Sequence, residues 1–188
     1  MGRWQPDARG RLAEAALELY GERGFEQTTV AAIAERAGLT ERTFFRHFAD
    51  KREVLFAGAD ALADLLVSTV AGVPDSAPPI DAVAAALEAA GGLFQEHRQG
   101  VQVRQAIIAA NPELQERELI KLAALATTLA DSLRQRGTED PAASLTAEAG
   151  IAVFKIAFER WVEDVDQQDL RHLISDSLEE LKAVTAGV

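Results

Sequence analysis

Residues 28–55, TTVAAIAERAGLTERTFFRHFADKREVL, constrain the fold of this chain more than any other stretch. Thr29 is a good N-cap for a short helix over residues 30–36, because its hydroxyl can accept a hydrogen bond from a backbone N–H of the first turn. Gly38 tolerates the left-handed conformation that ends a helix, and Thr40 can cap a second short helix. Two short helices joined by a three-residue turn that contains glycine have the sequence form of a helix-turn-helix.

The order and spacing of these residues, TTVxxIAxxAGLTxxTFFxHFxxK from Thr28 to Lys51, resembles the DNA-binding head of the TetR family of bacterial transcriptional regulators. The resemblance implies an all-α fold of nine helices. It also implies a three-helix helix-turn-helix domain over residues 1–55 and an effector-binding and dimerisation domain over residues 56–188.

Net charge limits how such a head can bind DNA. The chain has 188 residues and a formal net charge of −11, but residues 1–56 hold nine of the 19 basic and nine of the 30 acidic residues. The rest of the chain therefore carries the whole acidic excess and repels phosphate, which only the basic residues between Thr40 and Arg52 can offset. We expect DNA binding that is sensitive to salt and weak on random sequence.

Composition and spacing also narrow the classes of function. The chain has no cysteine, which excludes disulfides and thiolate metal sites. We expect a cytoplasmic protein with no membrane partner, because we find neither a signal peptide nor an apolar run of spanning length. His47, His97 and His172 are far apart, and no HExxH, nucleophile elbow or phosphate-cradling glycine loop occurs. We therefore predict no enzyme, and expect no catalytic residue, metal or cofactor.

Helical periodicity accounts for the remaining long segments. A long helix over residues 51–70 is expected to link the head to the body. The other expected helices cover residues 7–23, 41–47, 80–96, 99–110, 112–135, 141–165 and 169–184.

A recognition helix enters the major groove and reads base edges with its first turn, here residues 40–43. Arg42 can pair bidentately with guanine, which contributes about 1–3 kcal/mol of discrimination. The alternative for Arg42 is an arginine on a solvated helix face. Thr40 and Thr43 are candidates for phosphate or thymine-methyl contacts, although Thr40 can also act only as a cap.

The resemblance places His47 and Lys51 on the phosphate backbone. Most relatives have tyrosine where this chain has Phe45, so one phosphate contact is lost, at a cost of about 1 kcal/mol. Arg46 faces solvent or phosphate, and Arg3, Arg9 and Arg11 fit either an arm along the DNA or a disordered tail. The predicted DNA-binding residues are Thr28, Thr29, Thr40, Arg42, Thr43, Phe45, Arg46, His47 and Lys51.

The apolar residues of the body fit either an ordinary core or a ligand pocket. The resemblance favours a pocket, because bodies of this type bind small lipophilic or aromatic effectors. Arg104 lies in the apolar run VQVRQAIIAA and needs an anionic partner, which Glu148, Glu159 or an effector carboxylate or phosphate can supply. The predicted effector-binding residues are Phe94, His97, Arg104, Ile107, Ile108, Leu122, Leu125 and Phe158.

The last two long helices carry more apolar residues than the edge of a monomer should expose, and the resemblance makes them a dimer seam. The predicted interface residues are Phe154, Trp161, Leu170, Leu173, Ile174 and Leu178. A two-fold dimer would read a palindromic operator with its recognition helices about 34–36 Å apart.

These observations predict a ligand-responsive, homodimeric transcriptional repressor. An effector would tilt the helix over residues 51–70 and so change the separation of the two heads, provided that it binds one separation better than the other. The alternative is an architectural or cell-division-associated DNA-binding protein of the same fold with no small-molecule effector.

Overall fold

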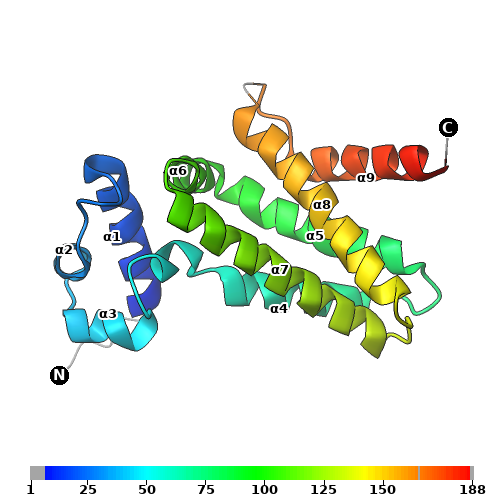
Figure 1. The fold of residues 1–188 in the computed structure, drawn as a ribbon, viewed down its shortest axis with the longest axis horizontal. Coiled ribbons are helices and arrows are strands. Elements are labelled where there is room, and N and C mark those ends of the chain that lie inside the picture. The colour runs from blue at the N-terminus through cyan, green and yellow to red at the C-terminus, as the bar shows by residue number, and fades with distance from the viewer. Residues whose placement is uncertain (1–6, 165, 187–188) are drawn as a thin grey trace. The chain divides into compact units, whose positions relative to one another are not determined.

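The computed structural model describes residues 7–164 and 166–186, and in these ranges it contains nine α-helices, one 3-10 helix and no strand (Figure 1). The predicted all-α fold is confirmed, and most helix ends lie within two residues of their predicted positions. The elements are α1 (Ala8–Arg23), α2 (Val30–Arg36), α3 (Glu41–His47), η1 (Glu53–Phe56), α4 (Ala59–Gly72), α5 (Pro79–Glu96), α6 (Arg98–Ala109), α7 (Pro112–Gln135), α8 (Ala142–Glu163) and α9 (Leu170–Ala186).

The predicted helix over residues 51–70 is wrong in its first part. A single 3-10 turn, η1, is followed by a turn at residues 57–58, and α4 begins only at Ala59. Val54, Leu55 and Phe56 are all buried, and three consecutive residues cannot share the one apolar stripe of an amphipathic α-helix. The burial of all three residues therefore does not fit the continuous amphipathic helix that we expected between the head and the body.

The segment Glu53–Gly72 is long and apolar enough to cross a membrane by length and composition, with a mean hydropathy of 1.7. This corrects our expectation that no run approaches that length. The test is passed equally by core helices of soluble proteins, so a single such segment is weak evidence. In this chain the turn at residues 57–58 interrupts the segment.

The first compact unit is formed by residues 7–59 together with residues 99–118. Its core contains buried side chains of α1, α2, α3 and η1, and also Ile107 and Ile108 of α6 and Leu114 of α7. The unit therefore includes a segment that the sequence analysis assigned to the second domain.

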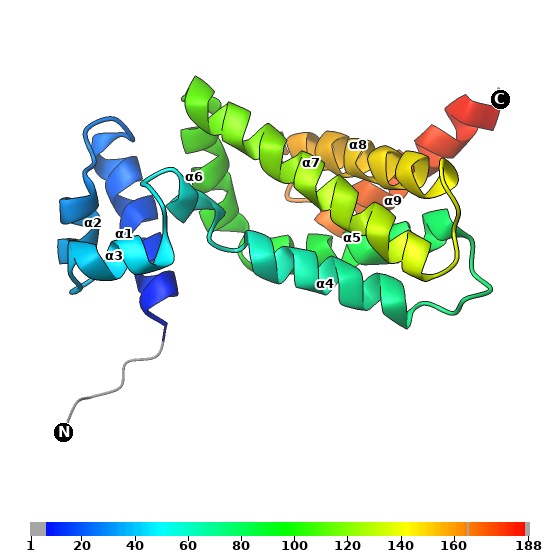
Figure 2. The ribbon, with the colours of Figure 1, turned by 60° about the horizontal axis from the view of Figure 1, so that its bottom comes forward.

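The second compact unit contains residues 60–98 and 119–186. Within it α5, α8 and α9 pack against one another (Figure 1). Gly150 of α8 permits close contact with α5, because a Cβ at this position would overlap Cγ1 of Val83. Figure 2 shows the carboxyl ends of α4 and α7 side by side, where Arg136 donates to the carbonyl oxygens of Val70 and Pro74, both at 2.8 Å.

Gly150→Ala should lower the free energy of unfolding by about 1–3 kcal/mol, because the added methyl group overpacks the contact with Val83. The matched control is Gly21→Ala in α1, where a Cβ would meet nothing within 4 Å. That change should be neutral or stabilising by up to about 1 kcal/mol. Urea unfolding of both variants checks the prediction, which fails if Gly150→Ala is as stable as the control.

Candidate nucleic-acid interface

The predicted helix-turn-helix is confirmed in its local geometry. Thr29 Oγ1 accepts from the backbone N–H of Ala32 at 3.2 Å, and Thr40 Oγ1 accepts from that of Thr43 at 3.2 Å, so both threonines are N-caps. Gly38 has a φ of 65°, which is the left-handed conformation expected for the turn. These contacts fix where α2 ends and where α3 begins.

The aromatic residues of α3 separate into a buried side and an exposed side. Phe44 is completely buried in the core of the first unit, and Phe48, which follows the helix, is 4% exposed. Phe45 is 56% exposed, although its ring edge contacts Phe44 with centroids 5.5 Å apart. The core therefore fixes which face of α3 is turned outward.

The exposed face of α3 carries Arg42, Phe45 and Arg46. Residues three and four apart are neighbours on a helix surface, so these side chains form one patch. Within the described part of the chain, neither Arg42 nor Arg46 makes a hydrogen bond or ion pair. This patch offers two unpaired guanidinium groups to an anion.

The described arginines of the proposed N-terminal arm point into the protein. Arg9 donates to the carbonyl oxygen of Ala57 at 3.0 Å and to that of His47 at 3.3 Å. Arg11 donates to the carbonyl oxygen of Ala37, which is the C-cap residue of α2. Both side chains therefore satisfy carbonyl groups at the ends of helices. Arg3 lies outside the described residues.

The resemblance implies that Lys51 contacts a phosphate, but in this structure the Lys51 side chain binds carbonyl groups of the protein itself. Its Nζ donates to the carbonyl oxygens of Phe25, Glu26 and Thr28 at 2.9, 3.3 and 3.3 Å, and it lies 4.3 Å from the centre of the Phe25 ring. Tyr20 Oη donates to the Lys51 carbonyl at 2.6 Å, and burial, aided by a nearby carboxylate, raises the pKa of this phenol. Lys51 thus holds the loop between α1 and α2.

Two further predicted phosphate contacts are also turned inward. Thr28 is 1% exposed, and its hydroxyl donates to the carbonyl oxygen of Gly24 at 2.8 Å. His47 Nε2 is buried, with no hydrogen-bond partner in the described structure. Of the predicted set, Arg42, Phe45, Arg46 and the capping threonines Thr29 and Thr40 are exposed, and Thr43 is half-buried. Their contact with DNA stays a prediction.

The predicted effector residues do not form one group. Arg104, Ile107 and Ile108 lie in the first unit, whereas Phe94, His97, Leu122, Leu125 and Phe158 lie in the second. Ile107 and Ile108 are core residues of the first unit, so their side chains are already enclosed by protein. Sequence spacing alone gave no indication of this division.

Arg104 has structural partners other than those we considered. Its Nε donates to the carbonyl oxygen of Leu55 at 2.7 Å, its Nη1 lies 3.3 Å from Glu118 Oε1, and its guanidinium lies 4.9 Å from the centre of the Phe56 ring. Burial lowers the pKa of Arg104, and the Glu118 carboxylate opposes this shift. The side chain is therefore part of an internal ion pair with Glu118, and its contact with an effector stays a prediction.

The second unit contains an aromatic cluster made of Phe94, Phe154, Phe158 and Trp161. Neighbouring ring centroids are 5.6–5.8 Å apart. Trp161 is fully buried, and its Nε1 donates to Gln95 Oε1 at 2.8 Å. Phe94 and Phe158 are half-buried, so they are the members that a ligand can reach.

The predicted interface residues are buried within a single copy of the chain. Trp161, Leu170 and Ile174 are fully buried, and the exposure of Phe154, Leu173 and Leu178 is 8% or less. Because α5, α8 and α9 pack on one another, these side chains belong to the core of the single chain, and their contact with a second copy stays a prediction. The exposed apolar residues of α8 are instead Leu145 and Ile156.

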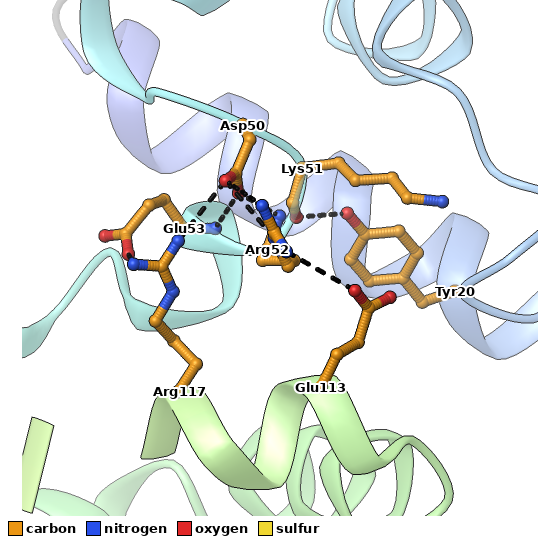
Figure 3. A network of polar contacts seen from close by, with 7 residues as sticks. All are labelled: Tyr20, Asp50, Lys51, Arg52, Glu53, Glu113 and Arg117. Atoms are coloured by element: carbon orange, nitrogen blue, oxygen red, sulfur yellow. Dashed lines mark hydrogen bonds and ion pairs between the residues drawn. The ribbon is translucent and has the colours of Figure 1, made fainter. Parts of the chain in front are cut away.

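The sequence analysis missed a polar network that joins the turn after α3 to the start of α7. Figure 3 shows Asp50, Arg52 and Glu53 beside Glu113 and Arg117. The local signals were the spacing of Glu113 and Arg117, which places both on one face of a helix, and the spacing of Asp50 and Glu53, which is that of an acidic capping box. The contacts between the two pairs span some sixty residues of the chain and have no local signal.

Comparison with known proteins gives the same class of protein. Residues 12–57 match the family described as bacterial regulatory proteins, tetR family, and residues 77–186 match the MftR C-terminal domain. The chain is 25% identical over 167 residues to the mycofactocin biosynthesis transcriptional regulator named MftR of Mycobacterium tuberculosis, covering 87% of this chain and 84% of that protein.

Two other similarities are shorter or more distant. The regulator TcmR of Streptomyces glaucescens is 36% identical over 88 residues, which span 47% of this chain and 39% of TcmR. The crystal structure of FadR from Thermus thermophilus in complex with lauroyl-CoA is 23% identical, covers 93% of each chain and has a TM-score of 0.60. The similarity to the FadR structure shows that the two chains share a fold.

The helix-turn-helix unit and the helical second unit together define a regulator of the helix-turn-helix class. The chain belongs to the tetR family of bacterial regulatory proteins, and its residues 77–186 belong with the MftR type of C-terminal domain.

Lys51→Met should lower the free energy of unfolding by about 1–3 kcal/mol, because it removes charged hydrogen bonds to three carbonyl groups. The control is Arg46→Gln, which removes an exposed cation without a partner in the described structure and should change stability by less than about 0.5 kcal/mol. If both variants lost the same free energy of unfolding in denaturant titrations, Lys51 would contribute no more to stability than Arg46.

Proposed function

We propose that the chain is a homodimeric transcriptional repressor that binds a palindromic operator through α3 and is released by a small lipophilic or aromatic effector. The observation that carries the proposal is the outward face of α3, with Arg42 and Arg46 unpaired in the described structure. Other cations of the first unit, such as Arg9, Arg11 and Lys51, are bound to carbonyl groups. Arg23 in the last turn of α1 is exposed as well, but α3 carries two exposed cations on one face, on the helix that would enter the major groove.

Few free cations imply a shallow dependence of affinity on salt. Each neutralised phosphate contributes about −0.9 to the slope of log K against log salt concentration. Arg46 on each of two heads gives a slope of about −2 for the dimer, because Arg42 is assigned to a base and not to a phosphate. Specific affinity must then come from base contacts and from two heads held at one spacing, because the acidic remainder of the chain opposes non-specific binding.

The effector proposal rests on the aromatic cluster of the second unit. Phe94 and Phe158 are half-buried and can offer ring faces to an apolar ligand. The FadR structure of the same fold holds lauroyl-CoA, which is a ligand with a long apolar chain. This similarity supports an effector of lipophilic character and does not identify it.

A duplex selected from a random library, together with genome-wide immunoprecipitation of the tagged protein, tests the proposed function. We expect a two-fold symmetric site, a few genomic targets, and release by a compound related to the products of those genes. Binding at many dispersed sites with no effector response would favour the alternative of an architectural or cell-division-associated DNA-binding protein.

Arg42→Gln should weaken binding to the selected duplex by about 1–3 kcal/mol per contacted base pair and relax selectivity at one position of each half-site. Arg46→Gln should weaken all duplexes alike and reduce the magnitude of the salt slope by about 2 in the dimer. Fluorescence anisotropy across a salt series measures both effects. Lys51→Met is the control, since a residue that contacts only carbonyl groups should leave the slope unchanged.

Ile156→Asp should dissociate the dimer. Ile156 lies on α8, which is expected at the interface, and is 54% exposed in the single chain. A carboxylate that becomes buried at this interface would be costly. Ile120→Asp on α7 is the matched control, with a parent side chain 57% exposed. Sedimentation velocity should show monomers only for Ile156→Asp. Monomers for Ile120→Asp alone would place the interface on α7.

A further inference from the structure

The turn after α3 is organised around the carboxylate of Asp50 (Figure 3). Its Oδ1 accepts from the backbone N–H groups of Arg52 and Glu53 at 2.8 and 3.1 Å, which caps η1. Its Oδ2 accepts from Arg52 Nη2 at 2.8 Å and from Arg117 Nη2 at 3.2 Å. Partial burial disfavours the charge, but the hydrogen bonds from the Arg52 side chain and from the backbone N–H groups of Glu53 and Arg52 outweigh it and lower the pKa of Asp50, so the group is ionised at neutral pH.

Arg117 joins two carboxylates of this turn to α7. Its Nη2 contacts Asp50, and its Nη1 lies 3.1 Å from Glu53 Oε1. One helical turn earlier on α7, Glu113 lies 3.4 Å from Arg52 Nη1. The side chain of Arg117 is 29% exposed and that of Glu53 is 21% exposed, so water screens this pair only partly.

The same part of α7 is also anchored by apolar contacts. Leu114 is fully buried in the core that contains Phe44 and Phe48. Phe44 belongs to α3, and Phe48 is its C-cap. The first turns of α7 and the helix proposed to read DNA therefore share one core, with the ionic contacts at its edge.

Helix continuity distinguishes α7 from α4 as a connection between the two units. The boundary between the units falls between residues 118 and 119, inside the unbroken helix Pro112–Gln135. The chain also crosses between the units after the turn at residues 57–58, where Gly58 has nothing within 4 Å of its Cβ position, and between residues 98 and 99, at the start of α6. Arg117 therefore lies on a continuous helix, whereas a turn with glycine precedes α4.

We propose that Arg117 is a positioning residue for the DNA-reading helix: from α7 it holds Asp50 and Glu53, and through them the turn that follows α3. The inference rests on the proposed function only for its effect on DNA binding.

Arg117→Gln in the full-length protein tests the inference by two independent measurements. We expect backbone amides of residues 41–56 to exchange with solvent several-fold faster, because the turn loses its contact with α7. We also expect affinity for the selected duplex to fall about tenfold, with the salt slope unchanged, because Arg117 is proposed to act through Asp50 and not on a phosphate. Arg117→Lys keeps one charge and should recover part of both effects.

The matched control is Arg134→Gln. Arg134 also lies on α7 and pairs with two aspartates, Asp131 at 2.7 Å and Asp140 at 2.8 Å, but it lies in the second unit. This variant should leave exchange in residues 41–56 and the affinity for DNA unchanged.

Asp50→Asn completes a double-mutant cycle, because asparagine keeps an oxygen for capping but removes the charge that Arg117 contacts. The loss of affinity in the double variant should be smaller than the sum of the two single losses, because the contact between Arg117 and Asp50 is removed in both single variants. Additive losses of affinity in the double variant would overturn the inference, and so would wild-type exchange and affinity in Arg117→Gln. A salt slope whose magnitude falls by about 2 in Arg117→Gln would also overturn it. If the wild-type protein bound no duplex, the proposed function would fail, while the exchange measurement would still decide the role of Arg117.

Discussion

The first unit depends on hydrogen bonds that cationic side chains donate to backbone carbonyl groups. Helices of seven residues such as α2 and α3 are not stable alone in water, and their last carbonyl groups lack partners within the helix. Arg9 donates to a carbonyl group at the end of α3, and Arg11 donates to one at the end of α2. Lys51 donates in the same way to the loop after α1. The short helices are therefore held in place by charges that a sequence comparison would assign to DNA.

This use of charge shapes the proposed activity. With those cations engaged, Arg42 and Arg46 remain unpaired among the described residues, on the outward face of α3. Most of the acidic excess lies beyond residue 56 and opposes DNA. A head with so little free charge gains affinity mainly from the simultaneous placement of two heads. The position of α3 then matters more than its charge, and the contacts of Arg117 with Asp50 and Glu53 are suited to control that position.

Local signals in the sequence were sufficient for all the helices except the one expected over residues 51–70, but not for the site. The caps at Thr29 and Thr40 and the turn at Gly38 could be predicted because each depends on residues no more than four apart. Arg104, Lys51 and Arg117 could not, because their partners lie between 14 and 67 residues away and depend on the tertiary fold. The predicted pocket and dimer seam stay predictions for the same reason: periodicity marks a buried face without showing whether the chain itself, a ligand or a second copy covers it.

The central claim is that the outward arginines of α3 meet DNA while Arg9, Arg11 and Arg117 serve the fold. Modification by an arginine-specific dicarbonyl reagent, read by mass spectrometry with and without the selected duplex, tests it directly. The account predicts that Arg42 and Arg46 react in the free protein and are protected by the duplex, whereas Arg9, Arg11 and Arg117 react slowly in both states. Unchanged reaction of Arg42 and Arg46 in the presence of bound duplex would contradict it.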